Sequence, residues 1–453
     1  MKKGIFRKFI SLALLAAVVA GILSFGGLSP AKADNGHAEN VILLIGDGMG
    51  YAQITAARLA QGKKLNMDRI KTMGTMTTVS ANNIVTDSAA AGTAMATGFK
   101  TNNGMISVTP DGKNLKTILE AAREKGKATG LVTTTRITHA TPAVFASHVG
   151  NRDDEDIIAA QMLNTNVDVM LGGGKSFFLP KAAGGKRTDN RNLIDKAKKN
   201  GYTVVTTGDE LAGVSGGKVL GLFNNSHMNY EVDRDLTKEP SLAAMTAKAI
   251  SLLDKDNNKD KEDKEGKNRG FYLMVEGGRI DHAAHANDPA GAVGDTLAFD
   301  AAVKVALDYA EKNRDTMVIV TADHETGGLI IGAGGEDAKS DIAMLGKVTK
   351  TAEYMGKQIK ADSSQIDAVF ARYAGITDLT AVERAGIETA SDKALAAANV
   401  ISARAGVKFN TGGHTGVTVP VMVTGEKEYE FSGLIDNTQI AKIIADAMNL
   451  ELN

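Results

Sequence analysis

Short apolar runs rich in β-branched residues alternate along most of this chain with longer, alanine-rich stretches that have helical spacing. Such runs are typical of strands buried on both faces, and the stretches between them have the length of helices. Because alternation of this kind is typical of parallel strands joined by crossover helices, it favours a sheet covered on both sides. The sequence therefore predicts an α/β fold, an α/β/α sandwich around a mainly parallel, twisted sheet.

The predicted strands are Val41–Ile45, Thr129–Thr133, Val167–Leu171, Thr203–Thr206, Val219–Phe223, Phe271–Val275, Met317–Thr321 and Val419–Val423. The predicted helices lie near Ala89–Thr97, Leu115–Lys125, Glu155–Asn164, Leu193–Asn200, Leu242–Asp254, Gly291–Asn313 and Thr438–Met448. Internal repeats are not evident.

A run of mixed charge, Asp254–Arg269, interrupts this pattern. Its acids at every second position resemble a calcium loop, but Lys259 stands where such a loop needs glycine. We expect a solvated surface loop, and calcium binding between Asp254 and Glu265 stays an open alternative.

A second departure is the stretch 332–410, which is rich in Asp, Lys and Ala with helix-like spacing. Metal-binding residue types flank it on both sides, Asp323 and His324 before it and His414 after it. We expect an insertion that caps the active-site edge of the sheet, because both of its ends return to that edge. A catalytic domain from residue 34 to residue 453 would contain it.

The first 33 residues have the form of a secretory signal peptide. Basic residues within the first eight positions precede the apolar stretch Phe9–Leu28, and Ala31-Lys32-Ala33 has the small-x-small form of a cleavage site. We expect export and cleavage after Ala33, with no stable membrane span afterwards. The alternative is an uncleaved anchor, since the apolar stretch is nearly long enough to span a bilayer.

Composition restricts the partners and the stabilising chemistry. Lys+Arg 52 against Asp+Glu 53 leaves a formal net charge of -1, so no global field attracts nucleic acid or anionic lipid. The chain contains no cysteine, which excludes disulfides, a thiol nucleophile and thiolate metal ligands. Metals and a large core must then supply the stability of the exported protein.

Asp281 and His285 are four residues apart in the segment I-D-H-A-A-H. A helical turn brings side chains at this spacing onto one face. Catalytic zinc usually takes about three protein ligands and leaves one position open, and His414 in the segment G-G-H-T-G can be the third. An ordinary polar helix face is the alternative for the pair alone.

Two further segments end apolar runs with ligand types. Asp323 and His324 follow M-V-I-V-T, and Asp47 follows V-I-L-L-I-G, so a second zinc could bind at neighbouring strand ends. Each aspartate could instead cap a helix. The glycines around Asp47 favour the metal site, because they permit a close backbone approach that a cap does not require.

Glu276 follows the apolar run F-Y-L-M-V, and Thr141 lies in I-T-H-A-T-P. Together with a shared Asp47 they form an all-oxygen set, which suits magnesium. A simple turn before proline is the alternative for Thr141.

Ser88 precedes a stretch of high helix propensity, so its hydroxyl would lie at a helix N-terminus, where an anion is favoured. A nearby zinc could ionise it, but Ser88 could also be only an N-cap. The planar fork of Arg152 could bind two phosphate oxygens. Its alternative is a salt bridge to Asp153, Asp154 or Asp156.

The order of these motifs resembles that of the alkaline phosphatase family from about Asn40 to Val423. The matching segments are D-G-M-G, T-D-S-A-A-A-G-T-A, H-A-T-P, E-G-G-R-I-D-H-A-A-H, T-A-D-H-E-T-G-G and H-T-G. The resemblance implies two zinc ions and one magnesium ion. It assigns Asp281, His285 and His414 to the first zinc, Asp47, Asp323 and His324 to the second, and Asp47, Thr141 and Glu276 to magnesium, with Ser88 as the nucleophile and Arg152 as the phosphate clamp.

Two positions depart from the best-studied bacterial members, which have Asp and Lys where this chain has His139 and His282. An imidazole in place of an acid should weaken magnesium and could admit zinc or cobalt as the third ion. His282 would contact phosphate through water, or only support the site. Asp87 and His139 are assigned supporting positions. The histidines that match no motif, expected to be structural or on the surface, are His37, His148 and His227.

The resemblance implies an exported, homodimeric phosphatase of broad specificity that hydrolyses phosphate monoesters through a phosphoserine and releases phosphate. A phosphodiesterase on the same fold is one alternative, and a sulfatase is excluded because its modified-residue motif is absent. An exported protein that binds metal or phosphate without turnover is the other alternative.

Overall fold

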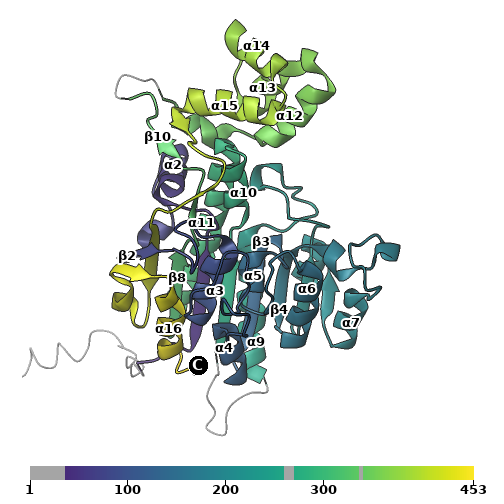
Figure 1. Ribbon diagram of the computed structural model, residues 1–453, viewed down its shortest axis with the longest axis vertical. Helices are drawn as coiled ribbons and strands as arrows, with labels where there is room; N and C mark the ends of the chain where they lie inside the picture. The colour runs from purple at the N-terminus through teal and green to yellow at the C-terminus, as the bar shows by residue number, and fades with distance from the viewer. Residues whose placement is uncertain (1–35, 260–269, 336–339, 453) are drawn as a thin grey trace, which may run out of the picture. The chain divides into compact units, whose positions relative to one another are not determined.

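The computed structural model describes residues 36–259, 270–335 and 340–452 and has a ten-stranded sheet at its centre (Figure 1). The strands follow the order β14-β2-β13-β8-β1-β7-β3-β4-β6-β5. β13 pairs antiparallel with β2 and β8, and the other pairings in this sheet are parallel. The strands are β1 Asn40–Ile45, β2 Thr72–Thr77, β3 Ala128–Arg136, β4 Val169–Gly173, β5 Thr203–Val205, β6 Val219–Leu222, β7 Phe271–Glu276, β8 Thr316–Thr321, β13 Val419–Thr424 and β14 Gly433–Asp436. The prediction of a mainly parallel sheet is confirmed.

The central strands are buried along their whole length. Every residue of β1, β7 and β8 is buried, as expected of parallel strands covered on both faces. The edge strand β14 and its neighbour β2 were not predicted, because neither is a continuous apolar run. The close approach of another segment requires glycine at position 74 in β2, since a Cβ there would lie 1.9 Å from the carbonyl oxygen of Phe431.

Helices cover both faces of the sheet (Figure 1). α3, α4 and α16 pack together on one face, and α9 and α11 pack together on the other. The helices are α2 Tyr51–Gln61, α3 Ser88–Thr97, α4 Ile118–Glu124, α5 Ala140–Ala143, α6 Glu155–Thr165, α7 Leu193–Lys199, α8 Gly208–Gly213, α9 Leu242–Lys259, α10 Arg279–His285, α11 Pro289–Lys312 and α16 Thr438–Ala447. Short 3-10 turns are η1 Met67–Arg69, η2 Lys175–Phe178, η3 Lys181–Ala183, η4 Glu231–Asp233 and η7 Glu428–Phe431. The α/β/α sandwich is confirmed.

A helical segment of residues 340–406, here called the crown segment, lies between the short strands β10 Ile330–Ile331 and β11 Val407–Lys408, which pair with each other. It contains η5 Ile342–Lys347, α12 Ala352–Ala361, η6 Ser363–Gln365, α13 Ile366–Ala374, α14 Ala381–Thr389 and α15 Lys393–Ala405. Its helices share a hydrophobic cluster that includes Met355, Phe370 and Ile401. The expected inserted segment is therefore present (Figure 1).

The expectation for the charged run is corrected at its start, because α9 continues to Lys259 rather than ending at Asp254. Its remainder, residues 260–269, lies outside the described residues, and so does the predicted leader, residues 1–33. Residues 38–452 belong to one compact unit. In the part of the chain that the structure describes, no helix is both long and apolar enough to cross a membrane.

Candidate active site

The predicted site residues meet at the carboxyl ends of the neighbouring strands β8, β1, β7 and β3. Asp47 lies just beyond β1, Asp323 lies just beyond β8, Glu276 is the last residue of β7, and His139 follows β3. Gly48 has a φ of 71°, and a Cβ on it would lie 2.8 Å from the Cα of Asp281. The close backbone approach expected beside Asp47 is confirmed.

A first cluster consists of Asp281, His285 and His414. The Nε2 atoms of His285 and His414 lie 3.0 Å apart, and that of His285 lies 3.3 Å from Asp281 Oδ2. Each ring turns its Nδ1 to a backbone carbonyl, that of Gly412 at 2.6 Å and that of Thr86 at 2.9 Å. Because a carbonyl only accepts, both Nδ1 atoms donate, which leaves the Nε2 atoms free to bind a cation.

The surroundings of Asp281 in this cluster favour the ionised form of its carboxylate. Burial acts to raise its pKa, but the hydrogen bond with His285 and the neighbouring histidines hold the pKa far below its ordinary value. The same hydrogen bond raises the pKa of His285 to about 9. His324 also lies close to this cluster. The ligand atoms of Asp281, His324 and His414 lie within 4.8 Å of one another, and the rings of His324 and His414 stack with their centroids 3.6 Å apart.

A second cluster is formed by Asp47, Asp323 and His324, all of them buried. His324 Nε2 lies 3.2 Å from Asp323 Oδ2 and 3.6 Å from Asp47 Oδ1. Burial and the neighbouring carboxylates raise the pKa of Asp47 well above its ordinary value and that of Asp323 to about 7, while burial lowers the pKa of His324. These surroundings favour the neutral form of all three side chains. A bound cation would instead favour the ionised form of the two carboxylates.

A third cluster unites Asp47, His139 and Glu276. Glu276 accepts hydrogen bonds from Thr133 and Thr135, and the hydroxyl of Thr141 lies 3.4 Å from Asp47 Oδ2. Thr141 therefore reaches the set expected for it. His139, assigned only a supporting position from the sequence, lies close enough to be a ligand.

The unpaired polar atoms of these clusters indicate what the site requires. Asp47 Oδ1, Glu276 Oε1 and His139 Nδ1 are buried and have no hydrogen-bond partner among the described residues. Nearly all buried polar atoms in proteins have a hydrogen-bond partner, so three unpaired atoms in one cluster indicate that another group binds there. A divalent cation is such a group, and the residues present fit such an ion.

Ser88 is the first residue of α3, and its Oγ lies 3.2 Å from His324 Nε2. The N-cap of the helix is Asp87, whose Oδ1 accepts the amide hydrogen of Ala90 at 2.9 Å. The alternative in which Ser88 caps the helix is therefore wrong. Its hydroxyl is directed to the second cluster instead.

Asp87 also holds Arg152. Nη1 of Arg152 donates to Asp87 Oδ2 at 2.9 Å, and Nη2 lies 3.2 Å from His139 Nε2. The same Oδ2 accepts the amide hydrogen of Gly104 at 2.9 Å. The alternative salt bridge from Arg152 to a neighbouring aspartate is not formed, so Asp87 fixes the guanidinium beside Ser88.

Sequence reasoning missed two residues near His282. Arg279 Nη1 lies 2.7 Å from His282 Nδ1, and the ring of His227 lies 4.4 Å from that of His282 and 5.3 Å from that of His139. His227 follows β6 in a segment without a recognisable motif, so no sequence signal identified it. The expectation for the other two histidines holds, since His37 is exposed and His148 pairs with Glu120.

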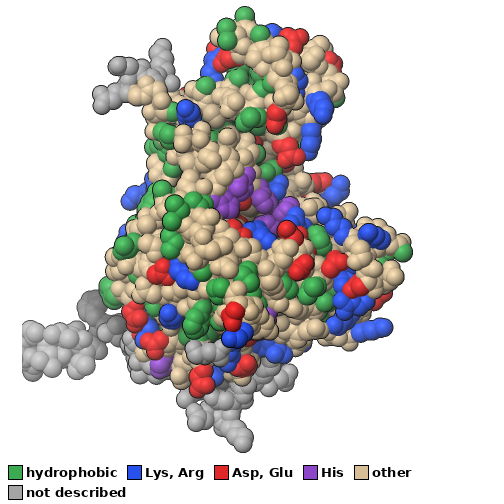
Figure 2. Space-filling view, in the orientation of Figure 1, with side chains coloured by type: hydrophobic (Ala, Val, Ile, Leu, Met, Phe, Trp, Pro, Cys, Tyr) green, Lys and Arg blue, Asp and Glu red, His purple; other side chains and the backbone are tan. Residues whose placement is uncertain are grey.

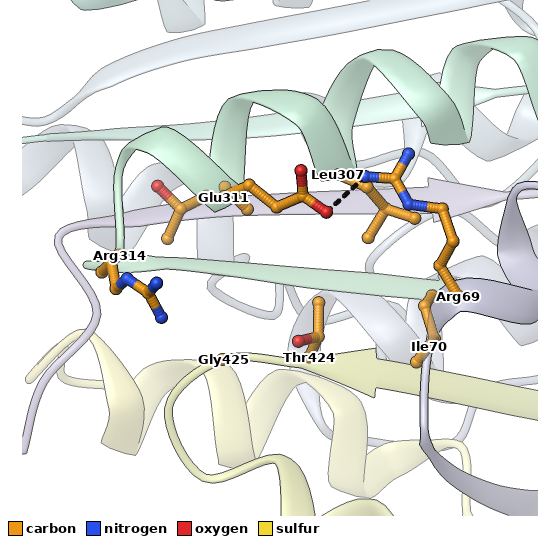
Figure 3. Close-up of a pocket in the computed structure, with 9 residues that line it drawn as sticks. Arg69, Ile70, Leu307, Glu311, Arg314, Thr424 and Gly425 are labelled. Atoms are coloured by element: carbon orange, nitrogen blue, oxygen red, sulfur yellow. Dashed lines mark hydrogen bonds and ion pairs between the residues drawn. The ribbon is translucent and has the colours of Figure 1, made fainter.

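A separate cavity lies at the opposite edge of the sheet, between the start of β8 and the end of β13 (Figure 3). Arg69 and Glu311 form an ion pair at 2.6 Å beside it. None of the predicted site residues lines this cavity.

Comparisons with known proteins agree with this geometry. A family model described as "Alkaline phosphatase" matches residues 38–450. "Alkaline phosphatase 4" of Bacillus subtilis (strain 168) is 39% identical, over 96% of this chain and 96% of its own length. The cold-active alkaline phosphatase of a psychrophilic Shewanella sp. has a similar structure, with a TM-score of 0.81 at 33% identity, covering 90% of this chain and 99% of that chain. A histidine-to-aspartate variant of TAB5 alkaline phosphatase, with magnesium bound in its M3 site, has a TM-score of 0.68 at 29% identity, covering 92% and 99%.

Proposed function

The chain belongs to the alkaline phosphatase family and is a phosphomonoesterase, and from this premise we propose that it works through a phosphoserine on Ser88 at a site of three divalent cations. The observation that carries the proposal is the position of the Ser88 hydroxyl, 3.2 Å from His324 at the start of α3 and beside clusters of buried carboxylates and imidazoles. A cation held by these clusters would lower the pKa of the Ser88 hydroxyl, and His324 would be one of its ligands.

The ligand sets of the proposal follow the clusters. Asp281, His285 and His414 would hold one zinc ion, and Asp47, Asp323 and His324 a second. Asp47, Thr141 and Glu276 would hold the third ion, for which magnesium is the family expectation. His139 adds an imidazole nitrogen to that oxygen set, which favours a softer ion such as zinc or cobalt. The ions, when bound, would lower the pKa of the Ser88 hydroxyl and of water and offset the charge of the phosphate.

In the first step, Ser88 Oγ attacks phosphorus in line. Ser88 gives its hydroxyl proton to solvent water, the new Oγ–P bond replaces the bond to the leaving alcohol, and the alcohol oxygen takes a proton from water. The N-terminus of α3 stabilises the negative charge near Ser88. Arg152, held by Asp87, binds two phosphate oxygens with its planar fork, and His282 contacts phosphate through water.

In the second step, water attacks the phosphoserine from the vacated side. The P–Oγ bond breaks, Ser88 recovers its proton, and phosphate leaves with net retention at phosphorus. Because the nucleophile must be ionised and the ligands deprotonated, activity should rise into alkaline pH. Few residues contact the leaving group in this scheme, so broad monoester specificity follows.

Export and dimerisation complete the proposal. Residues 1–33 would be removed as a signal peptide, and the mature protein would act outside the cytoplasm as a homodimer. N-terminal sequencing of protein from the culture medium or the periplasm tests cleavage after Ala33. Sedimentation equilibrium tests the dimer.

The central test compares Ser88→Ala with Ser147→Ala. Ser147 is also buried, but its hydroxyl donates to the carbonyl of Ala143 within the fold. We expect Ser88→Ala to lose nearly all turnover of nitrophenyl phosphate while it keeps its metal content, and Ser147→Ala to retain both. Mass spectrometry of the parent protein quenched in acid should find one phosphate on the peptide that contains Ser88.

Persistence of turnover in Ser88→Ala would refute the nucleophile assignment. A parent protein that hydrolyses bis(nitrophenyl) phosphate faster than the monoester would favour the phosphodiesterase. Binding of metal and phosphate without any turnover would favour the non-catalytic alternative.

A further inference from the structure

Arg279 opens α10, two residues before Asp281, and its guanidinium lies beside the site. Its Cζ lies 3.6 Å from the centroid of the Tyr230 ring, and its Nη1 donates to His282 Nδ1 at 2.7 Å. Its Nε is buried and has no hydrogen-bond partner among the described residues. The guanidinium is thus held in place by a ring and an imidazole, while its charge is not paired.

The missing partner distinguishes Arg279 from the other arginines near the site. Arg136 pairs with Glu155 at 2.7 Å and Arg152 pairs with Asp87 at 2.9 Å. Arg279 is partly buried, yet no carboxylate in the described part of the chain lies within 4.0 Å of its nitrogens. The other described arginines without such a partner, Arg123, Arg314 and Arg372, are exposed. A partly buried cation without a counter-ion is costly, so its retention beside the site suggests that an anion binds there.

The nearest acid that influences Arg279 does not replace that anion. Asp295 is buried and accepts the amide hydrogen of Glu231 at 3.2 Å. Burial raises the pKa of Asp295 to about 8, so at neutral pH it is protonated and carries no charge. The positive charge of Arg279 therefore remains available.

His282 beside Arg279 supplies a further hydrogen-bond donor, whereas both ring nitrogens of His227 face donors of Arg136, its backbone N–H and its guanidinium. The rings of His139, His227 and His282 lie within 5.5 Å of one another, centroid to centroid. Because arginine only donates, His282 Nδ1 must accept from Arg279, and the ring hydrogen of neutral His282 is on Nε2. Figure 2 shows histidine side chains gathered with basic ones in the groove below the crown segment.

We propose that Arg279, with His282 beside it, binds a second anionic group on the substrate, a carboxylate or a phosphate carried by the leaving group of the monoester. The site would then favour monoesters with an anionic leaving group, such as phosphorylated hydroxy acids and bisphosphates, over monoesters of neutral alcohols. This inference rests on the proposed phosphomonoesterase site, because His139 links the three rings to the clamp Arg152 at 3.2 Å.

Two matched substrate pairs test it. Glycerol 2-phosphate and 2-phosphoglycerate differ by a hydroxymethyl group against a carboxylate, and adenosine 5′-phosphate and adenosine 3′,5′-bisphosphate differ by a second phosphate. The readout is the ratio of kcat/KM for the anionic member to that for the neutral one. A ratio cancels any general effect of Arg279 on His282 and on the shared phosphate site. A preference in one pair alone identifies which anion binds.

In the metal-loaded parent we expect a ratio of about ten or more in at least one pair. Arg279→Gln should lower this ratio about tenfold, as expected for the loss of one charge-assisted bidentate contact. Arg279→Lys should lower it less, because it keeps the charge without the fork. Arg314→Gln is the matched control, since it removes one exposed positive charge at the opposite end of β8 and should leave the ratio unchanged.

A parent ratio near one in both pairs overturns the inference, even if a variant cannot be folded. A ratio that stays within twofold in Arg279→Gln also overturns it, because the preference would then have another origin. Failure of the proposed function is distinct, since the parent would then hydrolyse neither member of a pair.

Discussion

Removal of the Asp87 carboxylate tests how the start of α3 connects the nucleophile to the phosphate clamp. One side chain performs three tasks. Its Oδ1 caps α3 through the amide of Ala90, and its Oδ2 accepts from Gly104 and from Arg152, each contact at 2.9 Å. Asp87→Ala removes all three contacts, whereas Asp87→Asn can keep the cap and presents an amide to the other two donors.

The magnitude follows from these contacts. Loss of an aspartate N-cap costs about 1 kcal/mol. The neutral bond from Gly104 is worth about 1 kcal/mol, and the ion pair with Arg152 about 1 kcal/mol after discount for its partly exposed side chains. We therefore expect Asp87→Ala to lower the free energy of unfolding by roughly 3 kcal/mol and Asp87→Asn by roughly 2 kcal/mol.

Asp392→Ala is the matched control. Asp392 caps α15 through the amides of Ala394 and Leu395 at 2.9 and 3.0 Å, and it has no ion pair with an arginine among the described residues. Urea unfolding of the metal-saturated proteins should give about 1 kcal/mol for this variant. If Asp87→Ala costs no more than Asp392→Ala, the two Oδ2 contacts contribute nothing and the reasoning is refuted.

Asp87→Ala and Asp392→Ala should also differ in their KM for nitrophenyl phosphate. Without Asp87 the guanidinium of Arg152 loses its anchor, so KM for nitrophenyl phosphate should rise about tenfold or more, while Asp392→Ala keeps the parent value. An unchanged KM in Asp87→Ala would show that Arg152 is oriented by other contacts.

Three further predictions concern metals and pH. Chelation should lower the Tm and zinc should restore it, because ions at about a thousandfold excess over Kd stabilise by about 4 kcal/mol; an unchanged Tm in calorimetry would contradict the three clusters. His139→Asp should raise the affinity for magnesium at least about tenfold in a titration of activity, since it completes an oxygen set around Asp47 and Glu276; equal affinity would mean that His139 is not a ligand. Asp295 has a folded-state pKa of about 8 against an ordinary 3.8, so the folded state binds the proton more tightly and stability falls as pH rises from about 4 to 8. Between pH 5 and pH 9 the parent should therefore lose roughly 4 kcal/mol more than Asp295→Asn in urea unfolding, and parallel pH profiles would refute this assignment.

The sequence predicted the centre of the sheet and the edge strand β5 better than the end formed by β14 and β2. β1, β7 and β8 are continuous apolar runs because helices cover them on both faces, and their burial dictates their composition. β14 has one buried residue, Ile435, and β2 contains threonine and glycine among its methionines. β14 has only one partner strand, and β2 alternates buried with half-buried or exposed residues, so the composition of both is less restricted and gives a weaker signal.

The site shows the same division between local and tertiary information. Asp47, Glu276 and Asp323 were predictable because each ends or follows an apolar strand, where the topology brings them together. Asp281 and His285 were predictable because they share one face of a helix.

The partner of Arg152 was not predictable from the sequence. Asp87 lies 65 residues away from Arg152, whereas three other aspartates lie within four residues of Arg152. Likewise Arg279 lies in the segment E-G-G-R-I-D-H-A-A-H but was assigned no role there, His227 belongs to no motif, and only the fold shows their positions beside His282.

The buried carboxylates explain why the carboxyl ends of the strands determine so much of the geometry of the active site. Asp47, Asp281, Asp323 and Glu276 are all buried within one site, and each raises the pKa of a neighbour or has its own pKa displaced. Such groups cost free energy unless cations pair with them, so bound cations would stabilise these strand ends. Rigid strand ends hold the carboxylates at spacings that a cation can bridge, whereas mobile loops would let them separate. The stability of the sheet thus maintains the repulsion that cation binding relieves.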